Sequence, residues 1–279
     1  MSIKEMSNYM ADIKRMNIAA SKQLIDSHVN VAMEIKERQK DIDYMQCFRM
    51  EHQIIQGCNM KDIMTQLEAK MVRKYNMYTV LRLMSLLSTT NSGLKQAEFD
   101  QLRRGFSMCY GYQEISTILN LQDARLLKVR DKKFDWDKLK SELNLVNEEV
   151  KIDQPESIHY VFGGMAPISV SVLERMFALK GFQAIQRILN LLPGGESKPT
   201  LREEQEFFDA SSVRAKKVLV YFLGGITFAE IAAIRYLNSR SSKFKFVVAT
   251  TSIISSEKCM KQMRTAANNN LDLTSIIGQ

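Results

Sequence analysis

The stretch VLVYFLGGITFAEIAAIRYL, residues 218–237, decides the fold class because a strand and a helix meet in it. Residues 218–223 form a continuous apolar run, which is typical of a strand buried on both faces of a parallel sheet. The Gly-Gly pair at 224–225 permits a tight turn. Thr227 can cap the following helix, and Glu230 completes a capping-box pattern. The sequence therefore predicts a strand, a tight turn and a helix.

A second apolar run, FKFVVATTSII at residues 244–254, follows that helix and predicts a second buried strand. Together the two runs predict one β-α-β unit with parallel strands and a right-handed crossover. Two parallel strands leave the outer edges of their sheet unpaired and bury little apolar surface. Upstream of residue 218 the sequence shows no set of further strands alternating with helices. We therefore expect the sheet to be completed by sequence absent from this chain or by a partner.

Most of the sequence before this unit is typical of α-helices. Gly57 is expected to end one helix and Asn59 to cap the next. The apolar residues of that next helix recur at helical spacing and form one stripe: Met60, Ile63, Met64, Leu67 and Met71. Residues 80–87 are apolar nearly all round, which predicts a central, buried helix. Residues 159–177 are expected to begin as an extended piece and to become helical after Pro167.

The predicted fold class is mainly α with a C-terminal α/β piece. We expect a helical domain over residues 1–157 and a helical and extended connection over 158–215. A linker is predicted at 191–217, because this stretch contains two prolines, two glycines and many charges. The C-terminal β-α-β part is expected over 216–279.

The composition is that of a soluble globular protein, with 45% hydrophobic and 25% charged residues. The net charge of +8 is spread over several basic groups, among them residues 235–245, and no aromatic platform accompanies them. We therefore expect solvated faces rather than a nucleic-acid surface. No uncharged run is long and apolar enough to span a bilayer, so any membrane contact is expected to be peripheral.

The four cysteines and three histidines are scattered along the chain without a zinc-binding spacing. We therefore expect no metal site and no disulfide framework. Free thiols are typical of a reducing compartment, which favours a cytoplasmic location.

The Gly-Gly turn raises one enzymatic alternative, a phosphate- or nucleotide-binding α/β enzyme that uses Gly224, Gly225 and Thr227. A glycine turn before a capped helix can offer backbone N–H groups to an anion. However, the sequence contains neither the G-x-G-x-x-G nor the G-x-x-x-x-G-K-[ST] pattern there. No carboxylate pair or histidine partner stands at catalytic spacing either. We therefore expect turn chemistry, with no catalytic residue and no cofactor.

Several stretches resemble one family. The segments LGGITFAEIAAIRYL (223–237) and FVVATTSII (246–254) are similar to the closing β-α-β unit of the SM proteins, the Sec/Munc syntaxin-binding family. The similarity is greatest to the class C vacuolar sorting branch, the SM subunit of the HOPS and CORVET tethering complexes. Further similar stretches follow the order expected for that branch: VLRLMSLLSTTNSGLK (80–95), YGYQEISTILNLQDARLLK (110–128) and YVFGGMAPISVSVLERM (160–176).

This resemblance implies a non-catalytic subunit of an endosomal or vacuolar tethering complex. Such a subunit docks on a helical-solenoid partner, supports SNARE-mediated vesicle fusion and is cytoplasmic, peripheral on endosomal, lysosomal or vacuolar membranes. In the family the central domain is discontinuous, with its first strands before the helical domain and its last strands after it. The resemblance covers neither the N-terminal domain nor the first part of the central sheet nor most of the helical hairpin arm. These regions carry much of the SNARE-binding surface, so we expect weaker SNARE binding.

The resemblance also implies a contact for the solenoid partner near the junction of the helical and central domains. The corresponding residues are Tyr160, Phe162 and Met165, with Lys128 and Arg130 as charges at the rim. Plain packing or solvation is the alternative for each of these residues. A further alternative for the whole chain is a structural scaffold subunit that makes no SNARE contact.

Overall fold

The computed structural model describes residues 18–57, 59–130, 136–151, 154–179, 181–192 and 215–270. The chain divides into two compact units, Met1–His52 and Gln53–Gln279. The described part of the first unit contains α2 (Ile18–Gln39) and most of α3 (Ile42–Gln56). Ion pairs one helical turn apart, such as Arg38–Glu34 at 3.0 Å, lie on the exposed surface of α2.

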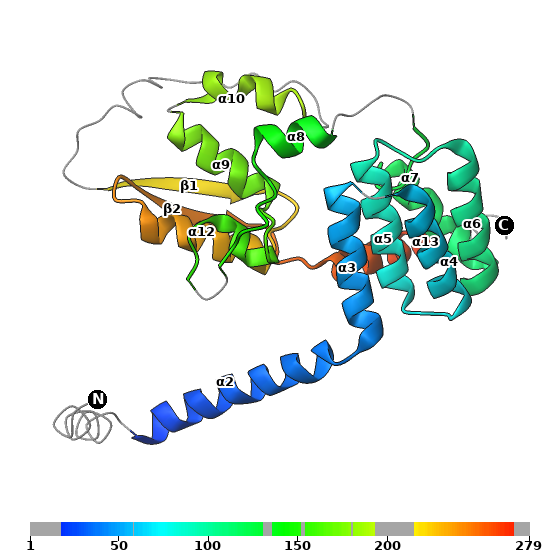
Figure 1. Ribbon diagram of the computed structural model, residues 1–279, viewed down its shortest axis with the longest axis horizontal. Coiled ribbons are helices and arrows are strands. Elements are labelled where there is room, and N and C mark those ends of the chain that lie inside the picture. The colour runs from blue at the N-terminus through cyan, green and yellow to red at the C-terminus, as the bar shows by residue number, and fades with distance from the viewer. Residues whose placement is uncertain are drawn as a thin grey trace, which may run out of the picture. The chain divides into compact units, whose positions relative to one another are not determined.

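The second unit contains a helical bundle (Figure 1). Its elements are α4 (Met60–Val72), α5 (Met77–Thr90), α6 (Gln96–Tyr110), η1 (Tyr112–Glu114), α7 (Ile115–Asp123) and α13 (Ser256–Asn270). Asn59 caps α4 by accepting a hydrogen bond from the Lys61 N–H, as predicted. The predicted central helix is α5, which packs against α4 and α13. Its core residues are at most 1% exposed: Val80, Leu81, Leu83, Met84 and Leu87.

The rest of the second unit combines short helices with the predicted β-α-β unit (Figure 1). The helices are α8 (Trp136–Glu142), η2 (Ile158–Phe162), α9 (Ile168–Ala178) and α10 (Phe182–Leu189). The unit itself consists of β1 (Lys216–Phe222), α12 (Phe228–Arg240) and β2 (Phe244–Thr250). The strands are parallel, with Val218 opposite Phe246. The predicted capping box of Thr227 and Glu230 is present at the start of α12. The fold class is therefore confirmed as mainly α with a C-terminal α/β piece.

Two local expectations were wrong. Residues 158–162 form a 3₁₀ helix rather than an extended piece, because Gly163 takes a left-handed conformation (φ +58°) and closes the turn. The strands are also not buried on both faces: exposure alternates along β1. The side chains of α9 and α12 pack together against one face of the sheet, around Val170, Ala233 and Phe246.

Part of the predicted linker, residues 193–214, lies outside the described residues. The boundaries of the three predicted domains remain predictions.

Candidate partner-binding surface

The segment that carries Tyr160 is held in place by its backbone and by the side chain of His159. The two ring nitrogens of His159 lie 2.9 Å from Ser157 Oγ and 2.6 Å from the carbonyl oxygen of Asn144. Gly164 N–H donates to the His159 carbonyl, and its own carbonyl accepts from Asn147 N–H. A β carbon at Gly164 would stand 2.7 Å from the Asn147 carbonyl oxygen, so only glycine fits this approach.

This segment presents two of the three aromatic and apolar residues expected to contact a partner. Phe162 is 44% exposed. Tyr160 is half-buried, with its hydroxyl 3.4 Å from the Ala232 carbonyl and its ring 5.6 Å from that of Tyr236. Met165, in contrast, is only 7% exposed and pairs with Val146 in an antiparallel bridge. Met165 is therefore a buried residue and not part of an exposed contact surface.

The two predicted rim charges belong to another segment. The backbone of Lys128 and Arg130 pairs with Leu94: Leu94 N–H donates to Lys128 O (2.9 Å), and Arg130 N–H donates to Leu94 O (2.8 Å). Arg130 Nε also donates to the Gly93 carbonyl at 3.4 Å. The five predicted residues are thus divided between the η2 segment and the segment that joins the end of α7 to α8.

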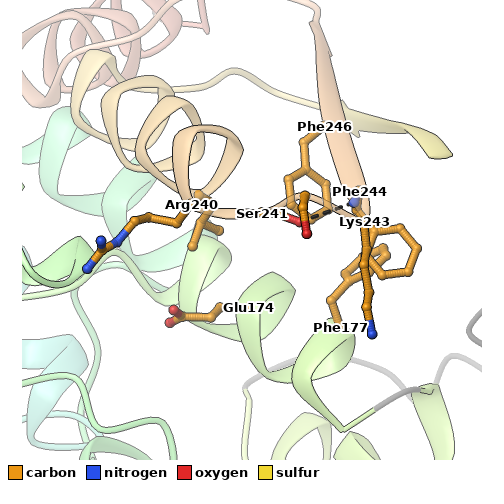
Figure 2. Close-up of a pocket in the computed structure, with 9 residues that line it drawn as sticks. Glu174, Phe177, Arg240, Ser241, Lys243, Phe244 and Phe246 are labelled. Carbon is orange, nitrogen blue, oxygen red and sulfur yellow. Dashed lines mark hydrogen bonds between the residues drawn. The ribbon is translucent and has the colours of Figure 1, made fainter. Parts of the chain in front are cut away.

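A pocket of about 370 Å³ opens between the C-terminal ends of α9 and α12 and the start of β2 (Figure 2). Its apolar wall contains Phe177, whose ring centroid lies 4.7 Å from that of Phe244 and 4.9 Å from that of Phe246. Figure 2 shows the side chains of Glu174 and Arg240 at the opposite end from these rings. The pocket therefore has Glu174 and Arg240 at one end and the aromatic rings at the other, where the side chain of Lys243 also lies.

The charges around the pocket are mainly basic. Arg240 and Lys243 line it together with the carboxylate of Glu174. Burial raises the pKa of Glu174, while the nearby charges of His159 and Arg175 act to lower it. A pocket that combines aromatic rings with charged side chains suits a ligand that is itself partly apolar and partly charged.

The Tyr236 ring lies between the η2 segment and Arg240, which lines the pocket. Tyr236 contacts the Tyr160 ring on one side, and the Arg240 guanidinium carbon lies 5.9 Å from its centroid. We call Tyr160, Phe162, Tyr236, Arg240 and the pocket residues the aromatic–basic surface. Sequence patterns indicated the basic group at 235–245 but gave no signal for Tyr236 or Phe177. These two became recognisable only when α9 and α12 were seen to converge.

Backbone N–H groups in and just after the Gly-Gly turn donate hydrogen bonds to other residues of this chain. Gly224 N–H donates to Thr251 Oγ1 at 3.0 Å, and Ile226 N–H donates to the Ser252 carbonyl at 3.0 Å. Thr227 N–H donates to the carboxylate of Glu230 at 2.8 Å. A carboxylate therefore occupies the helix N-terminus, where a bound phosphate would have to lie. Among the residues that the structure describes, no three His, Cys, Asp or Glu side chains gather as metal ligands.

Comparison with known proteins identifies the family. The Sec1 family model matches residues 1–262. The chain belongs to the Sec1 family. This confirms the resemblance to the SM proteins.

The curated relatives of this Sec1-family chain include vacuolar sorting proteins. It is 30% identical over 271 residues to vacuolar protein sorting-associated protein 33A of Rattus norvegicus, covering 94% of this chain and 44% of the relative. It is 34% identical over 243 residues to the vacuolar protein-sorting-associated protein 33 homolog of Arabidopsis thaliana, covering 81% of this chain and 40% of the relative. The chain thus spans less than half the length of these relatives.

A solved structure shares the fold. It is the SM protein Vps45 in complex with the Qa SNARE Tlg2, with a TM-score of 0.58 and 13% sequence identity. The match covers 96% of this chain and 44% of the Vps45 chain. The fold of this chain is therefore that of part of an SM protein. In the described residues no helix is both long and apolar enough to cross a bilayer.

Proposed function

We propose that this chain acts as a non-catalytic SM-type subunit in vacuolar protein sorting, within a tethering complex of the HOPS or CORVET kind. The observation that carries this proposal is the similarity to vacuolar sorting proteins, which extends over 94% of the chain for the rat relative. The proposed partners are a helical-solenoid subunit of the complex and SNARE proteins. The proposed location is cytoplasmic, peripheral on endosomal, lysosomal or vacuolar membranes.

The aromatic–basic surface supports a binding role rather than a catalytic one. Interfaces gain most of their energy from a few aromatic and arginine anchors, and helices dock in apolar grooves. Phe162 and Tyr160 offer aromatic contacts, and Arg240 and Lys243 offer charges at the rim. In this proposal Met165 stabilises the η2 segment from the protein interior, while Lys128 and Arg130 contribute charge from the separate segment between α7 and α8.

The direct test is binding of the purified full chain to the solenoid subunit of the class C complex from the same organism. Phe162→Asp should weaken the affinity at least about tenfold, because a charge would replace an aromatic anchor. Tyr112→Asp is the matched control, since Tyr112 is 72% exposed on η1, outside the aromatic–basic surface. Failure of the unaltered chain to bind, or equal loss in both variants, would contradict the proposal.

A structural scaffold subunit without SNARE contact is the second candidate. It is supported by the partial match, since the chain covers only 44% of the rat relative. Titration of the full chain with a SNARE domain separates the two candidates. Solenoid binding without measurable SNARE binding favours the scaffold, whereas binding to both favours the full SM-type role.

A further inference from the structure

The pocket between α9, α12 and β2 carries a net positive charge. Residues 231–256, which include most of α12 and all of β2, contain four basic residues and no aspartate or glutamate: Arg235, Arg240, Lys243 and Lys245. Arg240 and Lys243 line the pocket, and neither forms an ion pair with a residue that the structure describes. The lining contains one carboxylate, that of Glu174, at the end opposite the aromatic rings (Figure 2). The pocket therefore attracts anions.

Side-chain hydrogen bonds fix the connection between α12 and β2, which carries these charges. Asn238 Oδ1 accepts from Phe246 N–H at 2.7 Å, and Asn238 Nδ2 donates to the Phe246 carbonyl at 2.8 Å, so this side chain occupies the outer edge of β2. Ser241 Oγ accepts from Phe244 N–H at 3.1 Å, and its own hydrogen can be donated to a ligand. A connection that is fixed before a ligand arrives lowers the entropic cost of binding.

The C-terminus of α12 borders the pocket, and a lysine neutralises its carbonyl groups. The last carbonyls of a helix carry partial negative charge and ordinarily repel anions. Here Lys245 Nζ donates to the Asn238 carbonyl and, at 3.1 Å, to the Ser241 carbonyl. The Leu237 carbonyl accepts from Ser241 N–H at 2.9 Å. The end of this helix is therefore compatible with a bound anion.

Arg240 is positioned without using its hydrogen-bond donors. Its guanidinium carbon lies 5.9 Å from the centroid of the Tyr236 ring. A cation–π contact of this kind orients the guanidinium group, whereas its N–H groups stay available for oxygen acceptors. Arg240 can therefore pair with an anionic group at its end of the pocket.

The apolar part of the pocket is a cluster of three phenylalanine rings. The Phe177 ring packs edge-on against those of Phe244 and Phe246, at centroid distances of 4.7 and 4.9 Å. Lys243 lies at the same end (Figure 2). A ligand bound there would contact a cation and an apolar wall together. The volume of about 370 Å³ lies in the range of sites for small molecules.

We propose that this pocket binds an anionic phospholipid. Its phosphate is held by Lys243 and the Ser241 hydroxyl, and the start of its acyl chains packs against the three rings. Arg240, at the other end, attracts the headgroup. Phosphate oxygens are strong acceptors that can satisfy an ammonium and a hydroxyl together, and the rings favour an apolar group beside them. This inference stands independently of the SNARE and tethering roles proposed above.

The test titrates the purified full chain with dihexanoyl phosphatidic acid, a short-chain lipid, below the concentration at which it forms micelles. Calorimetry measures the affinity, and amide NMR shifts locate the site. Inorganic phosphate and dihexanoylglycerol are the comparison probes, because each carries only one part of the lipid. We expect the lipid to bind at least about tenfold more tightly than either, with shifts at Lys243 and Phe244. Equal affinity for either comparison probe, or no binding of the lipid, would overturn the proposal.

Single substitutions assign the binding to the pocket. Lys243→Gln should weaken binding of dihexanoyl phosphatidic acid at least about fivefold, because the phosphate would lose its ammonium partner. Arg240→Gln should weaken it less, since Arg240 lies at the other end of the pocket. Lys61→Gln is the matched control, because Lys61 is an exposed lysine on α4, and it should bind as the unaltered chain does. Unchanged affinity in Lys243→Gln, or an equal loss in Lys61→Gln, would overturn the proposal.

Sedimentation with vesicles tests the site at a membrane surface. Vesicles of equal parts phosphatidylcholine and phosphatidic acid should sediment the full chain, whereas vesicles of phosphatidylcholine alone should not. Added salt should release the chain, because it screens the attraction between exposed charges. Equal sedimentation with both kinds of vesicle, or none with either, would overturn the assignment of the pocket to a lipid.

Discussion

The helical bundle and the β-α-β part of the second unit differ in how completely each buries its own apolar surface. In the bundle, α5 is enclosed by its neighbours, and Leu81 and Leu83 are 0% exposed. In the β-α-β part, Leu219 and Tyr221 remain more than half exposed although they lie in the middle of a strand. The bundle therefore buries its apolar side chains completely, whereas the sheet leaves one apolar face exposed.

The strongest test of this difference compares the same substitution in the two parts. Leu81→Ala should lower the free energy of unfolding by about 2–5 kcal/mol, because it leaves a cavity in the bundle core. Leu219→Ala should change it by less than about 1 kcal/mol, since the side chain is largely exposed. Chemical denaturation of both variants measures these values. Similar losses would mean that the exposed sheet face is part of the core after all.

A smaller effect is expected from the ion pair that holds α13 on the bundle. Glu114 is 3% exposed and accepts hydrogen bonds from Arg264 at 2.7–2.9 Å and from Thr117 Oγ1. Glu114→Ala should cost about 2 kcal/mol of unfolding free energy, because Arg264 would lose its charged partner. The exposed pair Glu257–Lys261 provides the control, and Glu257→Ala should leave the denaturation midpoint unchanged. A null result at Glu114 would show that the Glu114–Arg264 ion pair contributes nothing to the docking of α13.

Removing a tyrosine hydroxyl group should lower the stability in the bundle but not in the β-α-β part. The Tyr110 hydroxyl in the bundle donates to the Tyr75 carbonyl at 2.6 Å, so Tyr110→Phe should cost about 1 kcal/mol. The Tyr236 hydroxyl oxygen on α12 is buried without a hydrogen-bond partner among the described residues. Tyr236→Phe should therefore be neutral or stabilising by about 1 kcal/mol. Thermal melts of both variants decide this, and a clear loss at Tyr236 would indicate a bound water or partner at its hydroxyl.

A further expected effect is a pH dependence of the stability of the bundle. Burial, with a smaller contribution from Cys109, raises the pKa of Tyr110 from 10.0 to about 12. Burial favours the neutral phenol of Tyr110 in the folded state. The contribution of Tyr110 to the free energy of unfolding is therefore complete below pH 10 and is lost as the pH rises toward about 12. Tyr110→Phe should remove this part of the alkaline loss of stability. Denaturation curves of the unaltered chain and of Tyr110→Phe, collected between pH 10 and about 12, measure this difference. Equal losses of stability in the two proteins would contradict the account.

Much of the fold could be predicted because the signals are local. The Asn59 cap, the Thr227–Glu230 capping box and the all-round apolar helix α5 each depend on residues close in sequence. The β-α-β unit was predicted on the same basis. The 3₁₀ helix at 158–162 was not, because the αL conformation of Gly163 that closes it is not visible in hydrophobic periodicity.

The candidate surface could be predicted only in part. Tyr160 and Phe162 were expected from the family resemblance and remain predictions as partner contacts; Phe162 is exposed and Tyr160 is half-buried. Tyr236, Phe177 and Asn238 were missed because their roles depend on contacts between α9, α12 and β2. Such contacts leave no spacing pattern in the sequence, so the aromatic–basic surface and the occupied edge of β2 emerged only from the structure.

Native-state amide hydrogen exchange of the chain alone tests the central contrast most directly. The account predicts that amides of α5, such as that of Leu83, exchange only through global unfolding. Even the inward-facing amide of Val220 in β1 should exchange through a smaller local opening, because a two-stranded sheet with one open face is marginally stable. If Val220 exchanged as slowly as Leu83, the sheet would be complete within this chain and the account would be contradicted.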